Sequence, residues 1–422
     1  MTTQTPPGPG TEVPRTRHHH RLAMVVLAVV AVLVVGVAVF VHRVQPAEPG
    51  VFYDPPANLA AAKPGDVLRS ESFTPALPNT SGWKVLYRST DPWGNPIAVS
   101  GVVLAPNGAN NGGGPRPVVS WAHPTTGIAR RCAPSLLDDP TSGMFGAREA
   151  VANGWVWVAT DYPGLGTPGP HPYLIGQSEA RAVIDIVRAA GALPTGAGTT
   201  YATWGHSQGG QASVWAGMIA NEYAPDLELI GVSAAAPAIQ LDTLVTADEN
   251  TFAGRYLLSL GLVSWSELYP DADLDVALQR PARPLARSIA KDCVETKNQS
   301  LVVAPKVEAA LRLPFAAVDL TTTEPWAGIL ASNAADGPID VPIFVGQGLD
   351  DKIVRPWSTR DALATRCEDG ETVEFVTYPD VGHIEAGDVT SPDAMAWIAG
   401  LLGGKAAPSN CDDLPAVPAQ GS

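Results

Sequence analysis

The sequence predicts an α/β fold with a mostly parallel central sheet, helices on both of its faces and an inserted helical cap. Short, nearly continuous apolar runs alternate with segments of helical periodicity, which is typical of buried parallel strands joined by helices. Hydrophobic residues make up 45% of the chain and charged residues only 16%, so the composition can form a core and argues against disorder. The alternation stops over residues 237–338, where a mostly helical pattern indicates the cap.

The sheet is expected to begin with an antiparallel hairpin and to continue with parallel strands. WKVLYRST (83–90) and IAVSGVVLAP (97–106) flank the turn DPWGNP, which is a hairpin pattern. Further strands are predicted at 117–123, 155–162, 199–204, 229–236, 341–348 and 373–379, and helices at 178–193, 211–223 and 393–404. We therefore expect a core made of 81–236 and 339–405, the cap over 237–338, and a C-terminal tail over 406–422.

The N-terminal residues are predicted to lie outside this fold. Residues 22–41 form an uncharged apolar run, which at about 1.5 Å per helical residue spans roughly 30 Å, the hydrocarbon thickness of a bilayer. Three arginines precede this run, so the positive-inside rule keeps the tail 1–21 in the cytoplasm and exports the rest. We expect a single-pass anchor in the cell membrane, followed by a stalk and lead-in over 42–80. A cleaved signal peptide with a secreted product is the main alternative, and a buried helix is the other.

Charge and cysteine content restrict the classes of function. Lys and Arg number 27 against 42 Asp and Glu, and the net charge of −15 excludes the basic surface that nucleic-acid binding needs. The cysteines are even in number and lack CxxC spacing, so in an exported chain two disulfides are favoured over zinc or redox sites. They are Cys132, Cys293, Cys367 and Cys411. Spacing leaves three pairings open, with four free thiols as the alternative. No metal or cofactor is implied, since His18–His20 is expected to be part of a solvated tail.

A candidate nucleophile lies between a predicted strand and a predicted helix. GHSQG (205–209) matches G-x-S-x-G, with the strand 199–204 before it and the helix 211–223 after it. In that context the glycines permit a strained turn that exposes the hydroxyl of Ser207 at a helix N-terminus. We therefore predict that Ser207 is a nucleophile.

A serine hydroxyl needs a positioned base, and a base needs an orienting acid. When the nucleophile lies in a G-x-S-x-G turn between a strand and a helix, the acid and then the histidine follow it along the chain. The histidine that follows Ser207 is His383, in the loop after strand 373–379, so His383 is the predicted base. The preceding strand ends in VGQGLDDKIV, which offers Asp350 and Asp351. The pattern G-x-x-D-x-x-V selects Asp351, with Asp350 facing solvent and Asp380 as a third candidate.

Acyl transfer to a serine also needs N–H donors for the oxyanion. The backbone N–H of Gln208 is one candidate. The second is Thr125, in the HPTTG loop after the strand 117–123, and its hydroxyl is a further candidate donor. A turn with no catalytic part is the alternative for this loop.

The stretch GLGTPG (164–169) matches G-x-G-x-x-G without predicting a nucleotide site. A dinucleotide site needs a helix to begin there, and the prolines at 168, 170 and 172 exclude one. Asp185, at the spacing of a ribose ligand, falls in the middle of the predicted helix 178–193. We therefore expect no nucleotide cofactor.

The motifs GHSQGG, HPTTG, DYPGLGTPGPHPYLIG and QGLDDKIV together resemble the secretory lipase family, the lipase A type of α/β-hydrolases, over roughly residues 50–415. The resemblance implies the α/β-hydrolase fold, a helical cap over the nucleophile, and hydrolysis of acylglycerols or other carboxylic esters. It implies a catalytic triad of Ser207, Asp351 and His383.

The same resemblance implies the disulfides Cys132–Cys293 and Cys367–Cys411. The sequence departs from the family at Pro124, where relatives look to have Gly. Proline lacks a backbone N–H, so this departure affects the loop that is expected to supply oxyanion donors.

These observations predict an exported serine ester hydrolase that acts on a lipid or another small-molecule ester through an acyl-enzyme. An acyltransferase with the same triad is one alternative, and a non-catalytic cell-surface interaction protein is the other. The apolar pattern FAGRYLLSLGLV (252–263) is expected to line an acyl tunnel or to form ordinary cap core.

Overall fold

The computed structural model describes residues 44–108, 110, 113–294 and 297–420, together with 1–6, 8 and 36. The apolar segment 22–41, for which the sequence predicts a membrane anchor, lies outside these residues except for Gly36. In the part of the chain that is described, no helix is both long and apolar enough to cross a membrane. From Pro46 onward the chain forms one compact unit.

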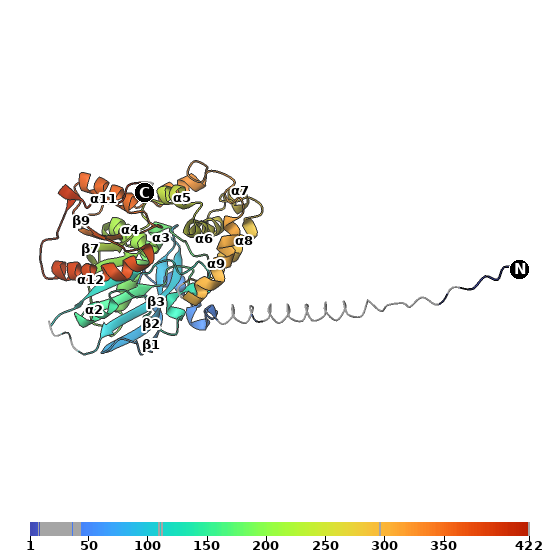
Figure 1. The fold of residues 1–422 in the computed structure, drawn as a ribbon. Coiled ribbons are helices and arrows are strands. Elements are labelled where there is room, and N and C mark those ends of the chain that lie inside the picture. Colours follow the sequence, from blue (N-terminus) through green and yellow to red (C-terminus); the bar gives the residue numbers. More distant parts are fainter. Residues whose placement is uncertain are drawn as a thin grey trace. The chain divides into compact units, whose positions relative to one another are not determined.

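The core of this unit is a nine-stranded sheet with the order β1-β2-β3-β5-β4-β6-β7-β8-β9 (Figure 1). The first strands are antiparallel: β1 (Val67–Phe73), β2 (Thr80–Thr90) and β3 (Pro96–Pro106), with β3 also antiparallel to β5. The others run parallel to one another: β4 (Arg116–Ala122), β5 (Val156–Thr160), β6 (Ala197–His206), β7 (Glu228–Ala235), β8 (Ile343–Gly348) and β9 (Val373–Tyr378). This arrangement confirms the mostly parallel sheet that the sequence predicts.

Strand β1 corrects the expectation for residues 42–80, which were predicted to be only a stalk and lead-in. Its sequence, VLRSESF, has no apolar run, and its residues are half-buried or exposed. The strand is held by backbone pairing with β2 at the edge of the sheet. Its end residues Val67 and Phe73 also pack against the apolar clusters of the core, but the residues between them show no alternating apolar pattern that would predict a strand.

Helices cover both faces of the sheet. On one face lie α3 (Gly176–Gly191), α4 (Gln208–Tyr223) and α11 (Pro356–Glu368), and on the other α2 (Ala147–Ala152) and α12 (His383–Leu402). Alternate residues of each strand enter the two layers: Val118 and Val158 pack beneath α3, and Val119 and Trp157 pack toward α2. This period of two is what a sheet buried on both faces requires.

Between β7 and β8 the described residues form six helices, which lie beside the sheet in yellow to orange (Figure 1). They are α5 (Leu241–Asp248), α6 (Phe252–Leu268), α7 (Leu274–Ala277), α8 (Arg283–Ile289), α9 (Lys297–Leu311) and α10 (Trp326–Ser332). Their apolar faces form a cluster of their own, which Tyr173 and Val354 of the core region also join. These helices occupy the interval in which the sequence predicts the cap.

Two disulfides join distant segments, with the pairing that the resemblance implies. Cys132–Cys293 links the loop after β4 to the helical segment, and Cys367–Cys411 links α11 to the C-terminal tail. The tail also pairs with β9 through Asn410, whose side chain donates to the carbonyl of Phe375 and accepts from its N–H. The tail therefore satisfies backbone groups that an edge strand would otherwise leave open.

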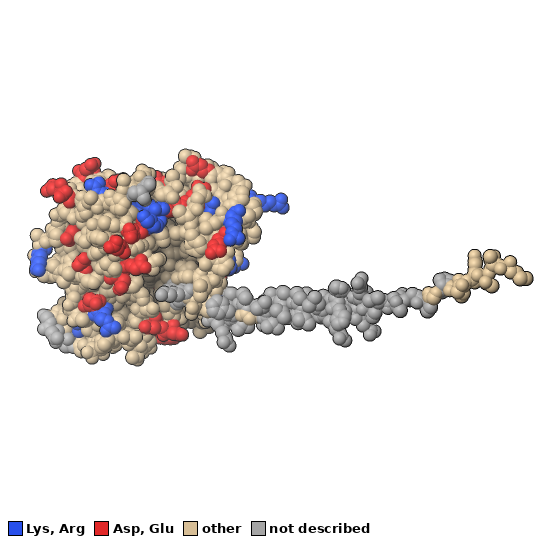
Figure 2. Space-filling model, viewed as in Figure 1, with Lys and Arg blue, Asp and Glu red and all other residues tan. Residues whose placement is uncertain are grey.

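Figure 2 shows acidic side chains spread over the visible face of the molecule, with basic ones lying between them. This distribution agrees with the net charge of −15 of the whole chain. The charged surface keeps the protein solvated, while the apolar side chains are gathered in the interior clusters.

Candidate active site

Ser207 lies at the turn between β6 and α4, in a conformation that is unusual for a residue with a side chain. Its φ is 57° and its ψ is −116°. A Cβ atom at Gly205 would lie 2.1 Å from the carbonyl oxygen of Gly209, and one at Gly209 would lie 1.9 Å from that of Ala122. Both glycines are therefore required by close backbone packing. The structure thus contains the strained turn that the sequence predicts.

Three of the predicted site residues form one chain of hydrogen bonds. The Nε2 atom of His383 lies 2.8 Å from the Oγ atom of Ser207, and its Nδ1 atom lies 2.7 Å from Oδ2 of Asp351. Asp351 is 1% exposed and His383 is 7% exposed. With Nδ1–H donating to the carboxylate, Nε2 is an acceptor for the hydroxyl of Ser207. This is the arrangement in which a serine can pass its proton to a histidine.

Asp351 is held by contacts with its own loop. Its Oδ1 atom accepts hydrogen bonds from the backbone N–H groups of Ile353 and Val354, at 2.8 and 2.9 Å. Its Oδ2 atom accepts a bond from the Nε2 atom of Gln347 at 3.1 Å, besides the bond from His383. The two other candidate acids, Asp350 and Asp380, are exposed. The carboxylate that faces the imidazole is therefore that of Asp351.

His383 occupies a different local structure from the one expected. The sequence predicts a loop there and a helix from 393, but α12 already begins at His383. Proline at 392 suggests a helix boundary because it leaves the carbonyl of Asp388 without its helical N–H partner. In the structure the hydroxyl of Ser391 donates to that carbonyl at 3.0 Å, so the helix continues through the proline. The start of α12 is fixed by His206, whose Nε2 atom lies 2.9 Å from the carbonyl oxygen of His383.

The other histidines near the site are buried and neutral. Burial lowers the pKa of His123 to about 4, that of His171 to about 3 and that of His206 to about 3. The imidazole is the charged form when protonated, and removal from water disfavours that form. His206, beside the nucleophile in sequence, bonds to the backbone of His383 and makes no hydrogen bond with Ser207.

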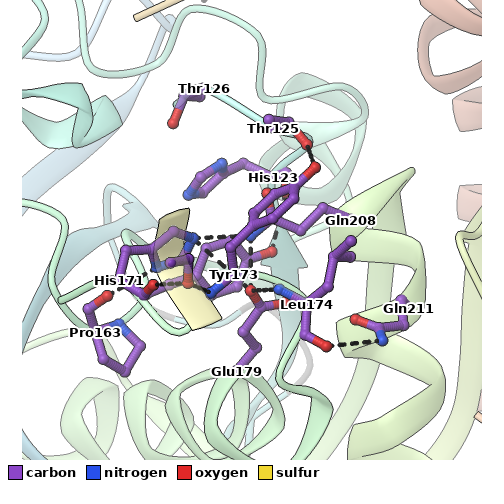
Figure 3. Close-up of polar contacts among 12 residues, drawn as sticks. His123, Thr125, Thr126, Pro163, His171, Tyr173, Leu174, Glu179, Gln208 and Gln211 are labelled. Atoms are coloured by element: carbon purple, nitrogen blue, oxygen red, sulfur yellow. Dashed lines mark hydrogen bonds and ion pairs between the residues drawn. The ribbon is translucent and has the colours of Figure 1, made fainter. Parts of the chain in front are cut away.

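Both candidate oxyanion residues lie next to Ser207. Gln208 is the first residue of α4, a position whose backbone N–H has no partner within the helix. Thr125 lines a cavity together with Ser207, and its Oγ1 atom lies 2.9 Å from the hydroxyl of Tyr173. The side chain of Gln208 points into a buried polar cluster, where its Nε2 atom contacts His171 and Glu179 (Figure 3).

Sequence reasoning missed this polar cluster. It contains Glu179 and His171, both in contact with the side chain of Gln208, and Tyr173, which contacts Thr125. All three follow GLGTPG in the chain. His171 and Tyr173 lie in the loop before α3, and Glu179 lies in the first turn of α3, which begins at Gly176. The only signal available was the presence of PHPYLIG in the family resemblance.

A large cavity opens beside Ser207. Its volume is about 520 Å³, and its lining is mostly apolar, with Met144 and Phe145 from the core and Tyr256, Leu257 and Val303 from the helical segment. A smaller cavity of about 70 Å³ lies on another side of Ser207, between α5 and α6. Helix α6 contributes residues to the lining of both cavities and to the apolar cluster of the helical segment, and several of them, such as Tyr256 and Leu258, do both. Among the residues that the structure describes, no group of His, Cys, Asp and Glu side chains has the arrangement of a metal site.

Comparison with known proteins gives consistent relatives. The model of the secretory lipase family matches residues 143–410. The chain is similar to Lipase 10 of Candida albicans, with 25% identity over 85% of this chain and 82% of that protein. It is similar to Lipase A of Arthroderma benhamiae, with 25% identity over 85% and 80%. A Mycobacterium tuberculosis protein named as a probable inactive lipase matches at 26% identity over 86% and 84%.

Solved structures show the same fold. Candida antarctica lipase A in its closed state aligns with a TM-score of 0.70 and 21% identity, over 87% of this chain and 89% of that chain. The rice cell wall degrading esterase LipA from Xanthomonas oryzae aligns with a TM-score of 0.65 and 21% identity, over 82% and 100%. These likenesses confirm the α/β-hydrolase fold.

Proposed function

This chain belongs to the secretory lipase family and is a carboxylic ester hydrolase, and we propose that Ser207 is its nucleophile, His383 its general base and Asp351 the acid that orients His383. The proposal rests on one observation, the chain of hydrogen bonds from Ser207 through His383 to Asp351. Since one relative is named as a probable inactive lipase, family membership alone does not carry this assignment.

The reaction follows from the directions of these hydrogen bonds. Oγ of Ser207 bonds to the carbonyl carbon of the ester while its proton passes to Nε2 of His383, and the carbonyl π electrons move to the oxygen. When this tetrahedral intermediate collapses, the alcohol leaves with the proton from His383 and the acyl group remains on Ser207. Water then repeats the sequence: His383 takes its proton, hydroxide adds to the acyl carbon, and Ser207 leaves with the proton. Asp351 stabilises the imidazolium in both halves.

We assign the oxyanion contacts to the backbone N–H of Gln208 and to Thr125. Gln208 supports this role as the first residue of α4, where N–H groups are unpaired and the helix dipole favours negative charge. Thr125 supports it through its position in the same cavity as Ser207. Pro124 has no backbone N–H and is therefore not one of the donors of this loop.

The substrate class follows from the cavity beside Ser207. A volume of about 520 Å³ with a largely apolar lining suits the acyl chain of a lipid ester. Phe252 and Ile384 also line this cavity while remaining 45% and 71% exposed, so its entrance is apolar as well. We therefore propose that acylglycerols or related long-chain esters are bound, with the helices over 237–338 acting as the cap.

We also propose that the protein acts outside the cytoplasm, with residues 22–41 as its export signal or anchor. The family is secretory, and two disulfides are stable in an oxidising compartment. Cell fractionation with N-terminal sequencing tests this. A membrane-bound protein that keeps its first residues identifies an anchor, and a shorter protein in the medium identifies a cleaved signal. A reduced cytoplasmic protein would contradict export.

The experiment for the proposed function is hydrolysis of p-nitrophenyl esters from acetate to palmitate by the full-length protein and its Ser207→Ala variant. The proposal predicts turnover of long-chain esters by the wild type and a loss of about 10⁴-fold or more in the variant. Turnover that survives the substitution would show that another group is the nucleophile.

A further inference from the structure

A carboxyl group that takes no part in the proposed reaction is buried next to it. Glu179 lies in the first turn of α3 and is 0% exposed. Burying an acid without a strong partner is costly, and in the described part of the chain Glu179 has no Lys or Arg partner: the basic group that lies within 4 Å of it is His171, at 3.8 Å. Burial raises the pKa of Glu179 to about 8, and it lowers that of His171 to about 3. Burial thus favours the neutral form of both groups near pH 7, and Glu179 contacts its neighbours through hydrogen bonds.

His171 sets the directions of the hydrogen bonds that the amide group of Gln208 makes in this cluster, whose contacts Figure 3 shows as dashed lines. Nδ1–H of His171 donates to the carbonyl of Pro163 at 2.8 Å, which leaves Nε2 as an acceptor. The amide Nε2 of Gln208 lies 3.1 Å from that acceptor and 2.7 Å from Oε1 of Glu179. Both amide hydrogens of Gln208 are therefore used, and the side chain has one orientation. These two contacts hold the side chain of Gln208, and the backbone N–H of the same residue is the proposed oxyanion donor.

Glu179 also holds the backbone next to Tyr173, the residue that contacts the second oxyanion candidate, Thr125. Its Oε1 atom accepts a bond from the backbone N–H of Leu174 at 3.0 Å. Leu174 has a φ of 56°, which is strained for a residue with a branched side chain, so it needs such an external contact. The preceding residue, Tyr173, bonds through its hydroxyl to Thr125. One carboxyl oxygen thus contacts Gln208 directly, and it connects to Thr125 through the backbone of Leu174 and the side chain of Tyr173.

We propose that Glu179 is a positioning residue for the oxyanion hole, which sets the placement of Gln208 and, through Leu174 and Tyr173, of Thr125. The proposal rests on the function proposed above. A small displacement of an oxyanion donor matters because the donor must meet the charge that develops in the transition state and not the ground-state carbonyl. The substitution of Glu179 therefore changes kcat and leaves the binding of the ester ground state largely intact.

The test measures kcat and KM for p-nitrophenyl butyrate, and Ki for a trifluoromethyl ketone that adds to Ser207 as an oxyanion, in the full-length protein. We expect Glu179→Ala to lower kcat by about 10- to 100-fold, with KM within about threefold, and Ki to rise in proportion to the fall in kcat/KM. Glu179→Gln keeps an oxygen that can accept both bonds and should retain kcat within about threefold of the wild type.

Two further variants separate positioning from general damage. Asp185→Ala removes another buried carboxyl from the same helix α3, one that bonds to Ser89 and Tyr223 away from the site, so it should lower Tm without changing kcat or Ki. Gln208→Ala keeps the backbone N–H but removes the anchored side chain. It should reproduce the loss seen in Glu179→Ala, and the double variant should lose no more than either single one.

The outcomes decide the proposal in each case. It is overturned if Glu179→Ala lowers Tm and leaves kcat and Ki unchanged. It is also overturned if Asp185→Ala lowers kcat as much as Glu179→Ala does, or if Glu179→Gln loses as much kcat as Glu179→Ala. If Glu179→Ala does not fold, the Gln208→Ala variant decides: a kcat equal to that of the wild type overturns the proposal. If the wild type hydrolyses the ester while Ser207→Ala does not, any such failure concerns Glu179 alone. If the wild type and Ser207→Ala are equally inactive, the proposed function fails and this inference fails with it.

Discussion

The Nε2 atom of His383 lies 2.8 Å from the Oγ atom of Ser207, although 176 positions separate the two residues in the chain. Ser207 follows β6, Asp351 follows β8 and His383 follows β9. The carboxyl ends of parallel strands meet at one edge of a sheet, so three distant segments converge there. The fold supplies the convergence, and the local turns supply the orientation of each side chain.

The role of Asp351 predicts a specific loss in the Asp351→Asn variant. The amide can no longer hold the imidazole in the tautomer that accepts the proton of Ser207, so kcat for an ester should fall by about 10³–10⁴-fold. The matched control is Asp350→Asn, the exposed neighbour, which should keep wild-type kcat. Equal activity of the two variants would mean that Asp351 does not orient His383.

The two disulfides predict different consequences when they are removed. Replacing Cys367 and Cys411 by Ser opens a loop of 44 residues, which on the loop-entropy model lowers the free energy of unfolding by about 4 kcal/mol. Neither Cys367 nor Cys411 is among the residues that line the two cavities at Ser207, so kcat should not change.

Replacing Cys132 and Cys293 should lower both stability and kcat. The loop that this disulfide holds contains Thr126. The hydroxyl of Thr126 donates to the carbonyl of Cys132, and its backbone carbonyl accepts from the N–H of Val294. Thr126 lines the cavity at Ser207. Urea unfolding and ester kinetics on the same preparations compare the two pairs, and an unchanged kcat in the Cys132/Cys293 variant would show that the loop keeps its place without the bond.

The proposed acyl site predicts a change of chain-length preference in Ala304→Phe. Ala304 lies on α9 and lines the 520 Å³ cavity, so a larger side chain fills space that the acyl chain would occupy. The ratio of kcat/KM for palmitate over butyrate esters should fall by at least about tenfold. Glu308→Phe, at an exposed position of the same helix, is the control. A ratio that stays constant would place the acyl chain elsewhere.

The raised pKa of Glu179 predicts how stability depends on pH. Its pKa is about 8 in the folded protein against an ordinary value of 4.5, so between these values the folded state keeps a proton that the unfolded state has lost. Stability from this group is therefore complete below pH 4.5 and declines as pH rises toward 8, by up to about 1.4 kcal/mol per pH unit. The titratable neighbours His171 and Tyr162 stay neutral over this range.

The variant Glu179→Gln cannot titrate, so its free energy of unfolding in urea should fall less steeply than that of the wild type between pH 5 and 8. Other buried acids, such as Asp185, with a pKa raised to about 6 by burial, contribute equally to both proteins. Their effect therefore cancels in the comparison. Parallel slopes for the two proteins would contradict the raised pKa.

The sequence predicted those features that depend on local composition. The parallel strands are apolar because both faces of the sheet are covered, and the glycines around Ser207 are required by contacts within the turn itself. Asp351 could be selected because its loop pattern is local too. By contrast, β1 pairs with β2 through its backbone and is polar between its ends, so its sequence has no alternating apolar pattern.

The polar cluster behind Gln208 could not be predicted for a different reason. A glutamate in the first turn of a helix is ordinarily a solvated residue that favours the helix dipole. Only the packing of the loop 171–175 and of α4 against α3 buries Glu179 and brings it to Gln208. The start of α12 was missed because Ser391 compensates for the proline beside it, a contact that exists only once the helix has formed.

The most direct test of the central claim is covalent labelling with a fluorophosphonate probe, followed by mapping of the modified peptide by mass spectrometry. The full-length protein should carry one adduct, on Oγ of Ser207, and the folded Ser207→Ala variant should carry none. The folded Asp351→Asn variant should react much more slowly, because its imidazole no longer activates the hydroxyl. An adduct on another residue, or a folded wild-type protein that does not react, would contradict the assignment of Ser207 as the nucleophile.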